Sequence, residues 1–478
     1  MQYKNPIIFC DYSDPDVIRV DKYFYMVASS FNFVPGVPVL RSENLVEWEL
    51  VNYVITKLPF ERFNGKVCAG DGAWAPSIRF HNGKYYCLIP FPDDGIYVSE
   101  AYTPEGEWTP LRPLIEGKGI IDPCPIWEGD KCYVAVAFAR TRAGFNSRIG
   151  LYEVTPDLTE CLSETYKIIY DGHENNPIIE GPKFYKRGQY FYILAPAGSV
   201  KSGWQVALRS EKITGPYRSK VILMQGDTLV NGPHQGALID TPDGRDWFIH
   251  FQDMRAYGRV VHLQPVDWYA GWPICGKVKY DGIAGTPVDG GEYPVDCTCA
   301  DGANKTPYSK RFWQLPANPH KGLFANGNIL MCAPYVERFD LLPNAATVKL
   351  AQKEFNFKVS IETNFETAGD EFGFGMLGGK YAYLSISDGK ICLVSFDGEK
   401  EKVKQICAAN RVNNLEVRGR FIAPFTLLCT FGINGRYIAE SYEITAGNWV
   451  GARLAMFARN KNAEKSAGFA KVLSFKVE

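Results

Sequence analysis

Short stretches in which hydrophobic and polar residues alternate run along most of the chain, and this is the pattern of β-strands. The stretches are rich in aromatic and β-branched residues, and Gly, Pro, Asp and Asn separate them. Tight polar turns such as residues 81–83 and 186–188 predict hairpins. No long amphipathic helix is indicated, so the pattern predicts an all-β protein.

Five of the most aromatic stretches share one layout. Each has a small or acidic residue with proline nearby, then an apolar strand, a tight polar turn and an aromatic strand. The units begin at Asp14, Ala75, Asp122, Gly181 and His234, at intervals of 47 to 61 residues. A β-repeat of this length is typical of propeller blades. We therefore expect a five-bladed β-propeller over residues 1–285, with an irregular β-sandwich as the alternative.

The composition changes beyond this region. Residues 286–308 are rich in Gly, Pro, Asp and Thr, which predicts a linker. Residues 309–478 contain two of the ten tryptophans, Trp313 and Trp449, and several alternating stretches such as residues 357–365. These features predict a second domain over 309–478, folded as a β-sandwich.

Charge and cysteine content restrict the partners and the compartment. The chain has 52 basic and 53 acidic residues, so we expect no nucleic-acid partner. No window approaches 18 consecutive apolar residues, so we expect no membrane span. The start of the chain lacks an export signal, and its 13 scattered cysteines suit reduced thiols in the cytoplasm. A secretion signal already removed is the alternative, and a homo-oligomer is left open.

The stretch "DYSDPDVIRV" places three acids, Asp11, Asp14 and Asp16, next to an apolar strand. A solvated turn, a cation loop or catalytic chemistry would each explain such a cluster. The innermost strands of propeller blades surround one axis, so residues at the same end of those strands face one another.

Four more residues occupy the position of Asp14 in the other units: Trp74, Asp122, Glu180 and His234. Carboxylates far apart in the sequence are thus expected to converge, which neither a turn nor a cation loop explains. Two carboxyl groups across a pocket, with a third nearby, suit hydrolysis of a glycosidic bond. One group protonates the leaving oxygen, and the other activates water.

Several ordered motifs carry a resemblance to a known family. They are "NPIIFCDYSDPDVIRV", "FVPGVPVLRSENLVEWELV", "GIIDPCPIW", "IIEGPKFYKRGQYFYIL" and "GPHQGALIDTPDGRDWFIHF". Together they resemble glycoside hydrolase family 43, which implies a five-bladed propeller and inversion of configuration. The segments "RFWQLPANPHKGLF" and "GNWVGARLAMFAR" resemble the concanavalin-like β-sandwich appended to many of the family's xylosidases. The final "FAKVLSFKVE" lacks the acidic pattern expected there.

The resemblance implies roles for the three carboxylates. Asp14, which precedes the proline of the first motif, would be the general base. Asp122, in "IDPCP", would raise the pKa of the acid and orient it, and Glu180, in "EGP", would be the general acid. Asp11 and Asp16 flank the base, and Asp16 is expected to be structural.

The resemblance also implies residues that contact the substrate. Trp74 would stack on a sugar ring, with core packing as the alternative. Phe31 would form a wall of the pocket, with Phe33 as the competing candidate. Arg259 would bind sugar hydroxyls and tune the carboxylates, with an interblade salt bridge as the alternative.

A histidine beside the acid is also implied. His234 occupies this position, and in some family members the equivalent residue binds calcium through one ring nitrogen and several waters. We expect no required cofactor, with a structural or activating calcium at His234 as the one metal to consider.

We therefore expect an exo-acting, inverting glycosidase that releases terminal β-D-xylosyl or α-L-arabinofuranosyl units from plant cell-wall oligosaccharides. Residues 195–210, "APAGSVKSGWQVALRS", depart from the common xylosidase loop, so the choice between the two sugars stays open. An arabinanase, an exo-galactanase and a carbohydrate-binding protein without catalysis are the alternatives.

Overall fold

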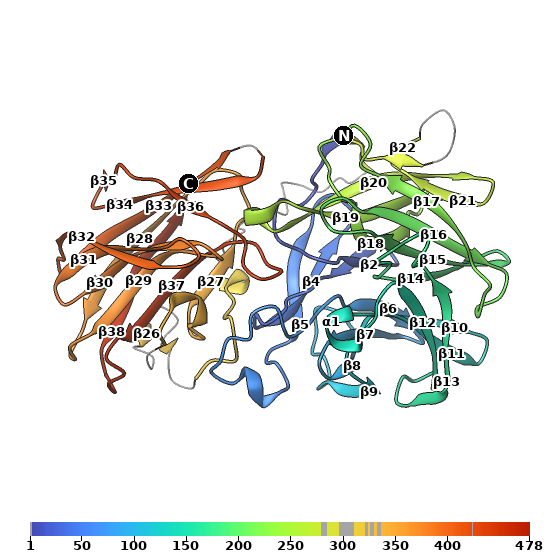
Figure 1. Cartoon of the computed structure of the whole chain (residues 1–478), viewed down its shortest axis with the longest axis horizontal. Coiled ribbons are helices and arrows are strands. Elements are labelled where there is room, and N and C mark those ends of the chain that lie inside the picture. The colour runs from blue at the N-terminus through green and yellow to red at the C-terminus, as the bar shows by residue number, and fades with distance from the viewer. Residues whose placement is uncertain are drawn as a thin grey trace.

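Strands make up most of the molecule and form two lobes (Figure 1). The structure is a computed structural model that describes residues 2–278, 284–295, 310–320, 324–325, 329–331, 336–422 and 424–478. We call β1 to β24 the first lobe and β25 to β38 the second lobe. One short α-helix, α1 (Arg140–Ala143), occurs among the described residues. The all-β prediction is confirmed.

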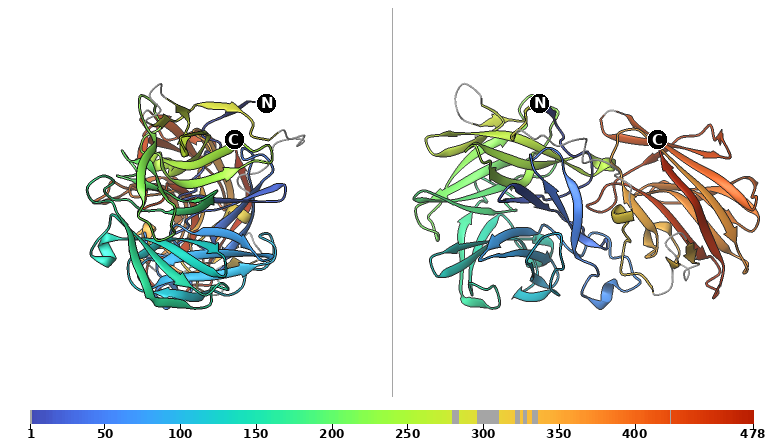
Figure 2. Two further views of the ribbon diagram at one scale, coloured as in Figure 1. Left: turned by 90° about the vertical axis from the view of Figure 1, so that its right-hand side faces the viewer. Right: turned by 180° about the vertical axis from the view of Figure 1, so that it is seen from behind.

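The first lobe contains five antiparallel sheets, each built from four strands that are consecutive in the chain (Figures 1 and 2). The first sheet comprises β2 (Asp16–Val20), β3 (Tyr23–Val27), β4 (Gly36–Ser42) and β5 (Glu49–Ile55). The second comprises β6 (Ser77–His81), β7 (Lys84–Phe91), β8 (Gly95–Ala101) and β9 (Arg112–Glu116). The third comprises β10 (Ile120–Glu128), β11 (Lys131–Phe138), β12 (Arg148–Val154) and β13 (Cys161–Asp171). The fourth comprises β14 (Lys183–Arg187), β15 (Tyr190–Ala197), β16 (Trp204–Ser210) and β17 (Arg218–Met224), extended by β23 (Gly285–Thr286) and β22 (Lys277–Val278). The fifth comprises β18 (His234–Asp240), β19 (Asp246–Asp253), β20 (Arg259–Tyr269) and β21 (Trp272–Cys275).

The first strands of these sheets form a closed ring. β2 contacts β6, β6 contacts β10, β10 contacts β14, β14 contacts β18, and β18 returns to β2. Among the described residues, the first and the fifth sheet share no strand that would connect them. An ion pair of 2.5 Å between Arg19 on β2 and Asp240 on β18 joins these two sheets instead. Asn5, in the segment before β2, also binds the fifth sheet through a bond of 2.8 Å from its Nδ2 to the Leu263 carbonyl. Residues that precede the first strands are thereby gathered at one end of the ring.

Tight turns start each sheet and fix the pairing register of its first hairpin. The predicted turn at residues 81–83 joins β6 to β7, and the turn at residues 186–188 falls between β14 and β15. Asn82 has φ 48° and Gly188 has φ 57°, conformations that asparagine and glycine tolerate best. Local turn chemistry therefore sets which strand faces are buried.

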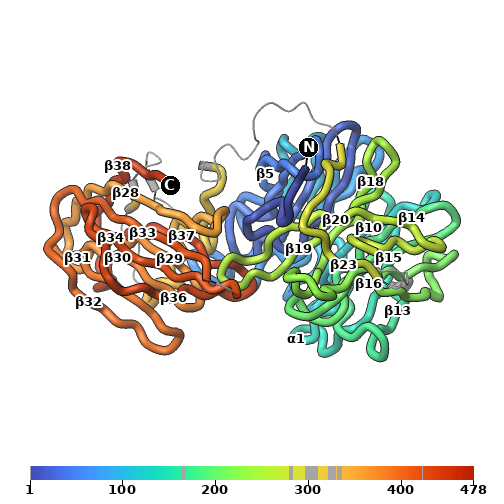
Figure 3. Tube along the Cα trace, turned by 90° about the horizontal axis from the view of Figure 1, so that it is seen from above, coloured from blue at the N-terminus to red at the C-terminus, as the bar shows by residue number. Residues whose placement is uncertain are grey.

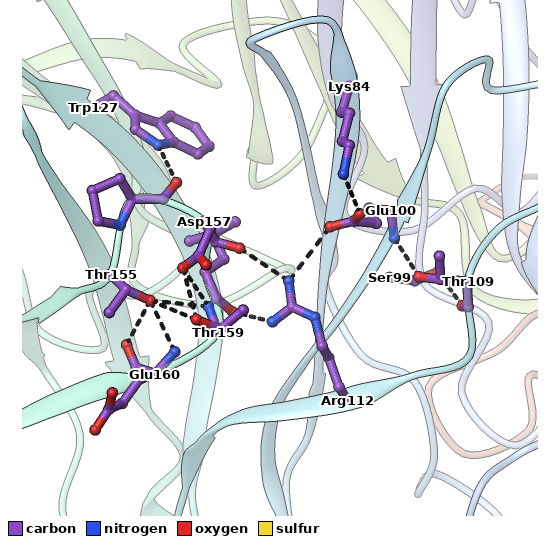
Figure 4. A network of polar contacts seen from close by, with 12 residues as sticks. Lys84, Ser99, Glu100, Thr109, Arg112, Trp127, Thr155, Asp157, Thr159 and Glu160 are labelled. Carbon is purple, nitrogen blue, oxygen red and sulfur yellow. Dashed lines mark hydrogen bonds and ion pairs between the residues drawn. The ribbon is translucent and has the colours of Figure 1, made fainter.

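Polar contacts link neighbouring sheets near their outer strands (Figure 4). The Arg112 guanidinium on β9 donates to the carbonyls of Asp157 and Leu158 in the next sheet, and it lies 3.6 Å from Glu100. Glu100 also accepts a bond of 2.7 Å from Lys84. Arg112 therefore holds the second and third sheets together.

A buried ion cluster lies where the innermost strands meet. Asp16 is fully buried and accepts bonds of 2.7 Å from Arg79 and 2.9 Å from the Ile78 N–H. The Lys183 ammonium lies 3.8 Å from the other carboxylate oxygen. Asp16 thus joins the first strands of three sheets, in agreement with the structural role expected for it.

Changing Asp16 to alanine should destabilise the protein by about 3–5 kcal/mol, because Arg79 and Lys183 would remain buried without their counter-ion. Urea unfolding followed by circular dichroism measures this change. Asp240→Ala is the matched control, since it removes an ion pair with 47% of the Asp240 side chain exposed and should cost less than about 1 kcal/mol. Equal destabilisation by the two variants would contradict the prediction.

The second lobe consists of two sheets and lies beside the first lobe (Figure 3). One sheet has the order β25 (Phe324–Ala325), β26 (Ile329–Met331), β38 (Phe469–Val477), β28 (Phe355–Asn364), β33 (Val412–Ile422), β34 (Thr426–Ile433) and β35 (Arg436–Tyr437), with β36 (Tyr442–Ile444) also on β34. The other has the order β27 (Ala346–Lys349), β37 (Arg453–Asn460), β29 (Asp370–Leu377), β30 (Tyr381–Ser387), β31 (Lys390–Phe396) and β32 (Glu401–Ala408). Fully buried Phe357 and Phe431 of the first sheet share one core with Phe372 and Leu454 of the second. Structural relatives described below support the prediction of a propeller followed by a sandwich.

The segment predicted as a linker is partly paired with the first lobe. β23 pairs with β17, and β24 (Gly290–Glu292) pairs with β1 (Gln2–Lys4). Residues 296–308 lie outside the described residues. The ten cysteines within the described part of the chain are all free thiols.

The two lobes are in direct contact. Tyr257, from the short helix η2 (Arg255–Tyr257) of the first lobe, packs into the core of the second lobe and donates to the Lys353 carbonyl at 2.8 Å. Residues 314–318 also pair with the first lobe, through bonds of 2.7 and 2.9 Å between Leu315 and Val34. None of the described helices is long and apolar enough to span a bilayer.

Candidate active site

All seven residues predicted to act at the site line one pocket of about 290 Å³. They are Asp14, Phe31, Trp74, Asp122, Glu180, His234 and Arg259. Five of these residues are buried, whereas Trp74 and Glu180 are half-buried. The polar groups therefore converge in a small space that is shielded from bulk water.

Asp14 lies just before β2 in a strained backbone conformation. Its φ is 56°, although it is not glycine and precedes Pro15. Oδ2 accepts bonds of 2.6 Å from the Ser13 hydroxyl and 2.5 Å from the Ser29 hydroxyl, and it lies 3.6 Å from Arg259 Nη1. These contacts fix the orientation of the Asp14 carboxyl group beside the Arg259 guanidinium.

Asp122 lies at an irregularity in β10, where the strand register shifts between Ile121 and Cys124. Its φ is also 56°, and it too precedes a proline. A bulge of this kind redirects a side chain from the sheet toward the pocket. Oδ2 accepts a bond of 2.8 Å from the N–H of Gly181, the residue after Glu180. Asp122 therefore holds the backbone that carries the predicted acid.

Glu180 is the most accessible of the three carboxylates, with 32% of its side chain exposed. Its Oε1 lies 3.1 Å from His234 Nε2, and its N–H donates to the Pro196 carbonyl at 3.1 Å. Gly181 is required next to it, because a Cβ there would lie 2.7 Å from the Gln235 side chain. Glu180 thus faces the pocket from a backbone segment that is fixed by hydrogen bonds at Glu180 and at Gly181.

Asp122, beside Glu180, retains its proton near neutral pH. Burial, and then the charge of Glu180, raise the pKa of Asp122 to about 8. Because the groups interact strongly, the proton belongs to the pair. The pair can therefore supply a proton to a leaving group in neutral solution.

This pair predicts the alkaline limb of the pH profile. On the alkaline side of the profile, glycosidase activity should be at its maximum well below pH 8. It should fall as the pH rises through about 8, because the proton is then lost. In Asp122→Asn the carboxyl with this raised pKa is absent, so the limb should no longer lie near pH 8. Measuring kcat/KM from pH 5 to 10 for both proteins tests this, and an unchanged limb in the variant would contradict it.

His234 is 1% exposed, and its ring nitrogen Nδ1 is buried without a hydrogen-bond partner. This nitrogen is the one observation that fits the predicted calcium. Calcium takes about six to eight oxygen ligands, and the described residues contain no cluster of three His, Cys, Asp or Glu that could hold a metal ion. An ion held by one ring nitrogen and several waters needs no such cluster, so calcium at His234 stays a prediction. The contact that the structure shows for His234 is the one with Glu180.

Arg259 and Phe31 line the pocket together with Asp14, and the competing candidate Phe33 lies elsewhere. Arg259 Nη1 donates to the Ser13 hydroxyl that in turn donates to Asp14. Phe31 has φ 51° and exchanges two backbone bonds with Ala73, which places its ring in the pocket. Phe33 instead packs under the Arg453 guanidinium, 3.6 Å from its ring centre.

Trp74 and a tryptophan from the second lobe form the aromatic part of the pocket. The Trp74 ring lies 6.4 Å from both Phe31 and Trp449 in edge-to-face geometry. Trp449 is 49% exposed, and the Arg259 guanidinium lies 5.6 Å from its ring. Such rings suit a sugar face.

Sequence reasoning missed Trp449 as a pocket residue, although it had noted that few tryptophans remain beyond residue 309. Three further pocket residues lie outside every stretch noted in the sequence, Arg140, Thr141 and Asn146. Two more were not singled out, although Gln235 lies in the fifth motif and Val200 lies in the departing loop.

Comparisons with known proteins agree with this site. The family model for glycosyl hydrolases family 43 matches residues 3–273. The chain belongs to this family. It is therefore a glycoside hydrolase, as predicted, and its substrate is a carbohydrate.

Curated relatives of this family 43 protein include enzymes for two sugars. A protein from Xylanibacter ruminicola, assigned as a beta-xylosidase, is 38% identical over 75% of this chain and 68% of its own length. A beta-xylosidase from Formosa agariphila is 32% identical over 66% of this chain and 59% of its own length. A non-reducing end alpha-L-arabinofuranosidase from Bacteroides ovatus is 28% identical over 59% of this chain and 54% of its own length.

Solved structures resemble both lobes of the family 43 protein. A family 43 protein from the xyloglucan locus of Bacteroides ovatus matches with a TM-score of 0.84 at 19% identity, and the match covers 100% of both chains. A xylan beta-1,4-xylosidase from Bacillus halodurans matches with a TM-score of 0.83 at 18% identity over 99% of each chain. These similarities show the fold.

Proposed function

We propose that the protein is an exo-acting, inverting glycosidase that releases terminal β-D-xylosyl or α-L-arabinofuranosyl units from oligosaccharides. Its first lobe would be a five-bladed propeller with one blade per four-stranded sheet, covering residues 1–285. Residues 286–308 would connect it to the sandwich of 309–478. The names of the curated relatives cover both sugars, so they support either activity.

The single observation that carries this proposal is the convergence of three carboxylates in one pocket that the second lobe helps to close. A pocket lined by Trp449 suits one terminal sugar, whereas an endo-acting arabinanase would need an open groove. Three carboxylates also argue against a protein that only binds carbohydrate.

The mechanism follows from the contacts. Asp14, held by two hydroxyls and Arg259, would remove a proton from the attacking water. Glu180, half-exposed in the pocket, would give the proton retained by the Asp122–Glu180 pair to the leaving oxygen. Water attacks from one side of the sugar and the aglycone leaves on the other, which inverts the anomeric centre.

A panel of substrates tests the proposal. Aryl β-D-xyloside and aryl α-L-arabinofuranoside are assayed side by side, and the first product anomer is followed by NMR. We expect turnover of at least one substrate, with a product of opposite anomeric configuration. Turnover of neither would overturn the substrate class, and a product of retained configuration would overturn the assignment of Asp14 as base.

A further inference from the structure

Asp11 takes no part in the mechanism above. It is nevertheless buried, with 6% of its surface exposed, and both of its carboxylate oxygens accept hydrogen bonds. Its Oδ1 accepts a bond of 2.9 Å from the Arg259 N–H, and its Oδ2 accepts a bond of 2.9 Å from the Gly451 N–H. The first partner lies 248 residues away in the first lobe, and the second lies 440 residues away in the second lobe. One carboxylate therefore bridges two distant segments across the boundary between the lobes.

The chain around this bridge is shaped to fit it. A Cβ at Gly258 would lie 2.3 Å from Asp11 Cγ, and a Cβ at Gly451 would lie 2.6 Å from the Gly258 nitrogen. Two glycines thus leave room for the carboxylate and for close approach of the two backbones. The Ala452 N–H donates to the Ala256 carbonyl at 2.7 Å beside them. A side chain at either glycine would push the lobes apart at this point.

The second lobe also supplies positive charge to the bridge. The buried Lys349 ammonium donates to the Asp11 carbonyl at 2.5 Å and lies 4.2 Å from the Tyr12 ring centre. Buried Arg453 of the second lobe also interacts electrostatically with Asp11. Two N–H donors and nearby cations offset the burial of a carboxylate, which is otherwise unfavourable.

Both segments that Asp11 holds lead directly into the pocket. Arg259 carries the guanidinium next to Asp14, and Trp449 lies two residues before Gly451 with φ 65°. The Arg259 guanidinium and the Trp449 ring then meet at 5.6 Å on the pocket wall. Asp11 fixes the backbone on each side of this contact.

We propose that Asp11 is a positioning residue that docks the second lobe so that Trp449 and Arg259 form one wall of the substrate pocket. It acts through these two residues and does not itself touch the sugar. The inference relies on the proposed function only for its kinetic readout.

The first test is Asp11→Asn with the substrate that the wild type turns over. The amide is nearly the same size, but its NH₂ group faces an N–H donor and one bridging bond is lost. We expect KM to rise about tenfold while kcat changes little. The reason is that the pocket wall binds the substrate in its ground state and in the transition state equally well. A merely structural defect would instead lower the active fraction, and thus the apparent kcat, at constant KM.

A double-mutant cycle with Trp449→Ala tests whether Asp11 acts through Trp449. If Asp11 acts through Trp449, most of the increase in KM caused by Asp11→Asn should disappear in the Trp449→Ala background. Asp253→Asn is the matched control, because Asp253 also accepts a backbone bond, of 2.8 Å from Arg255, within the first lobe. We expect its KM to equal that of the wild type.

A readout without catalysis keeps the proposal separate from the substrate assignment. Acrylamide quenching of tryptophan fluorescence is measured for each protein and for its Trp449→Phe counterpart, so that the difference reports Trp449. We expect Trp449 to be more accessible in Asp11→Asn, and also in Gly451→Ala, which separates the lobes at the same point without changing Asp11. Unchanged quenching in both folded variants, or equal KM effects of Asp11→Asn with and without Trp449, would overturn the proposal even if the substrate class were correct.

Discussion

Changing Glu180 to glutamine should lower kcat by about 10²–10⁴-fold for an oligosaccharide, because an amide cannot protonate the leaving oxygen. Glutamine has nearly the same shape, and its oxygen can still accept a bond from His234, which lies 3.1 Å from Glu180 in the native protein. The loss should therefore come from chemistry and leave KM nearly unchanged. Initial rates with purified protein measure it.

The leaving group provides the control for this prediction. A nitrophenolate leaves without protonation, so an aryl glycoside of that type should lose much less rate than an oligosaccharide. Glu128→Gln is a matched variant outside the pocket, since it alters an exposed ion pair of 2.5 Å with Lys186, and it should behave like the wild type. Equal losses for both leaving groups would contradict Glu180 as the acid.

Changing Asp14 to asparagine should also lower kcat by about 10²–10⁴-fold, because no other group would be placed to deprotonate the attacking water. Asparagine tolerates the φ of 56° that Asp14 adopts, so the backbone should remain in place. In contrast to Glu180→Gln, the loss should be similar for good and poor leaving groups. Steady-state kinetics with the same two substrates measures it.

Asp21→Asn is a close control for this change. Asp21 has φ 54° in the exposed turn between β2 and β3, so the same substitution is made in the same backbone conformation away from the pocket. Its kinetics should match the wild type. Near-normal activity of a folded Asp14→Asn protein would remove the assigned base.

The ring of sheets was predictable because its information is local and repeated. Each unit contains its own turn residues, such as Asn82 and Gly188, and each places a residue of the same rank near the start of its first strand. Because the units share one layout, Asp14, Asp122 and Glu180 are expected at the same end of the ring. No contact between distant residues has to be known for this prediction. Their convergence in one pocket follows from that repetition.

The rest of the site was not predictable because it depends on how the lobes dock. Trp449 enters the pocket through contacts such as the bond between Asp11 and Gly451, which join residues 440 positions apart. No periodicity in either segment encodes that pairing. The strands β23 and β24 were missed for a related reason, since they span two and three residues and look like linker in composition.

The position of Trp449 after the ring in the sequence has a consequence for synthesis. Domains generally fold in the order in which they leave the ribosome, so the ring can close once β21 has emerged. Its pocket would still lack one wall until Trp449 and the second lobe follow. A nascent chain would therefore become competent to hold its sugar only after the second lobe has been made, and a product that terminates before Trp449 would retain the three acids with an unfinished pocket.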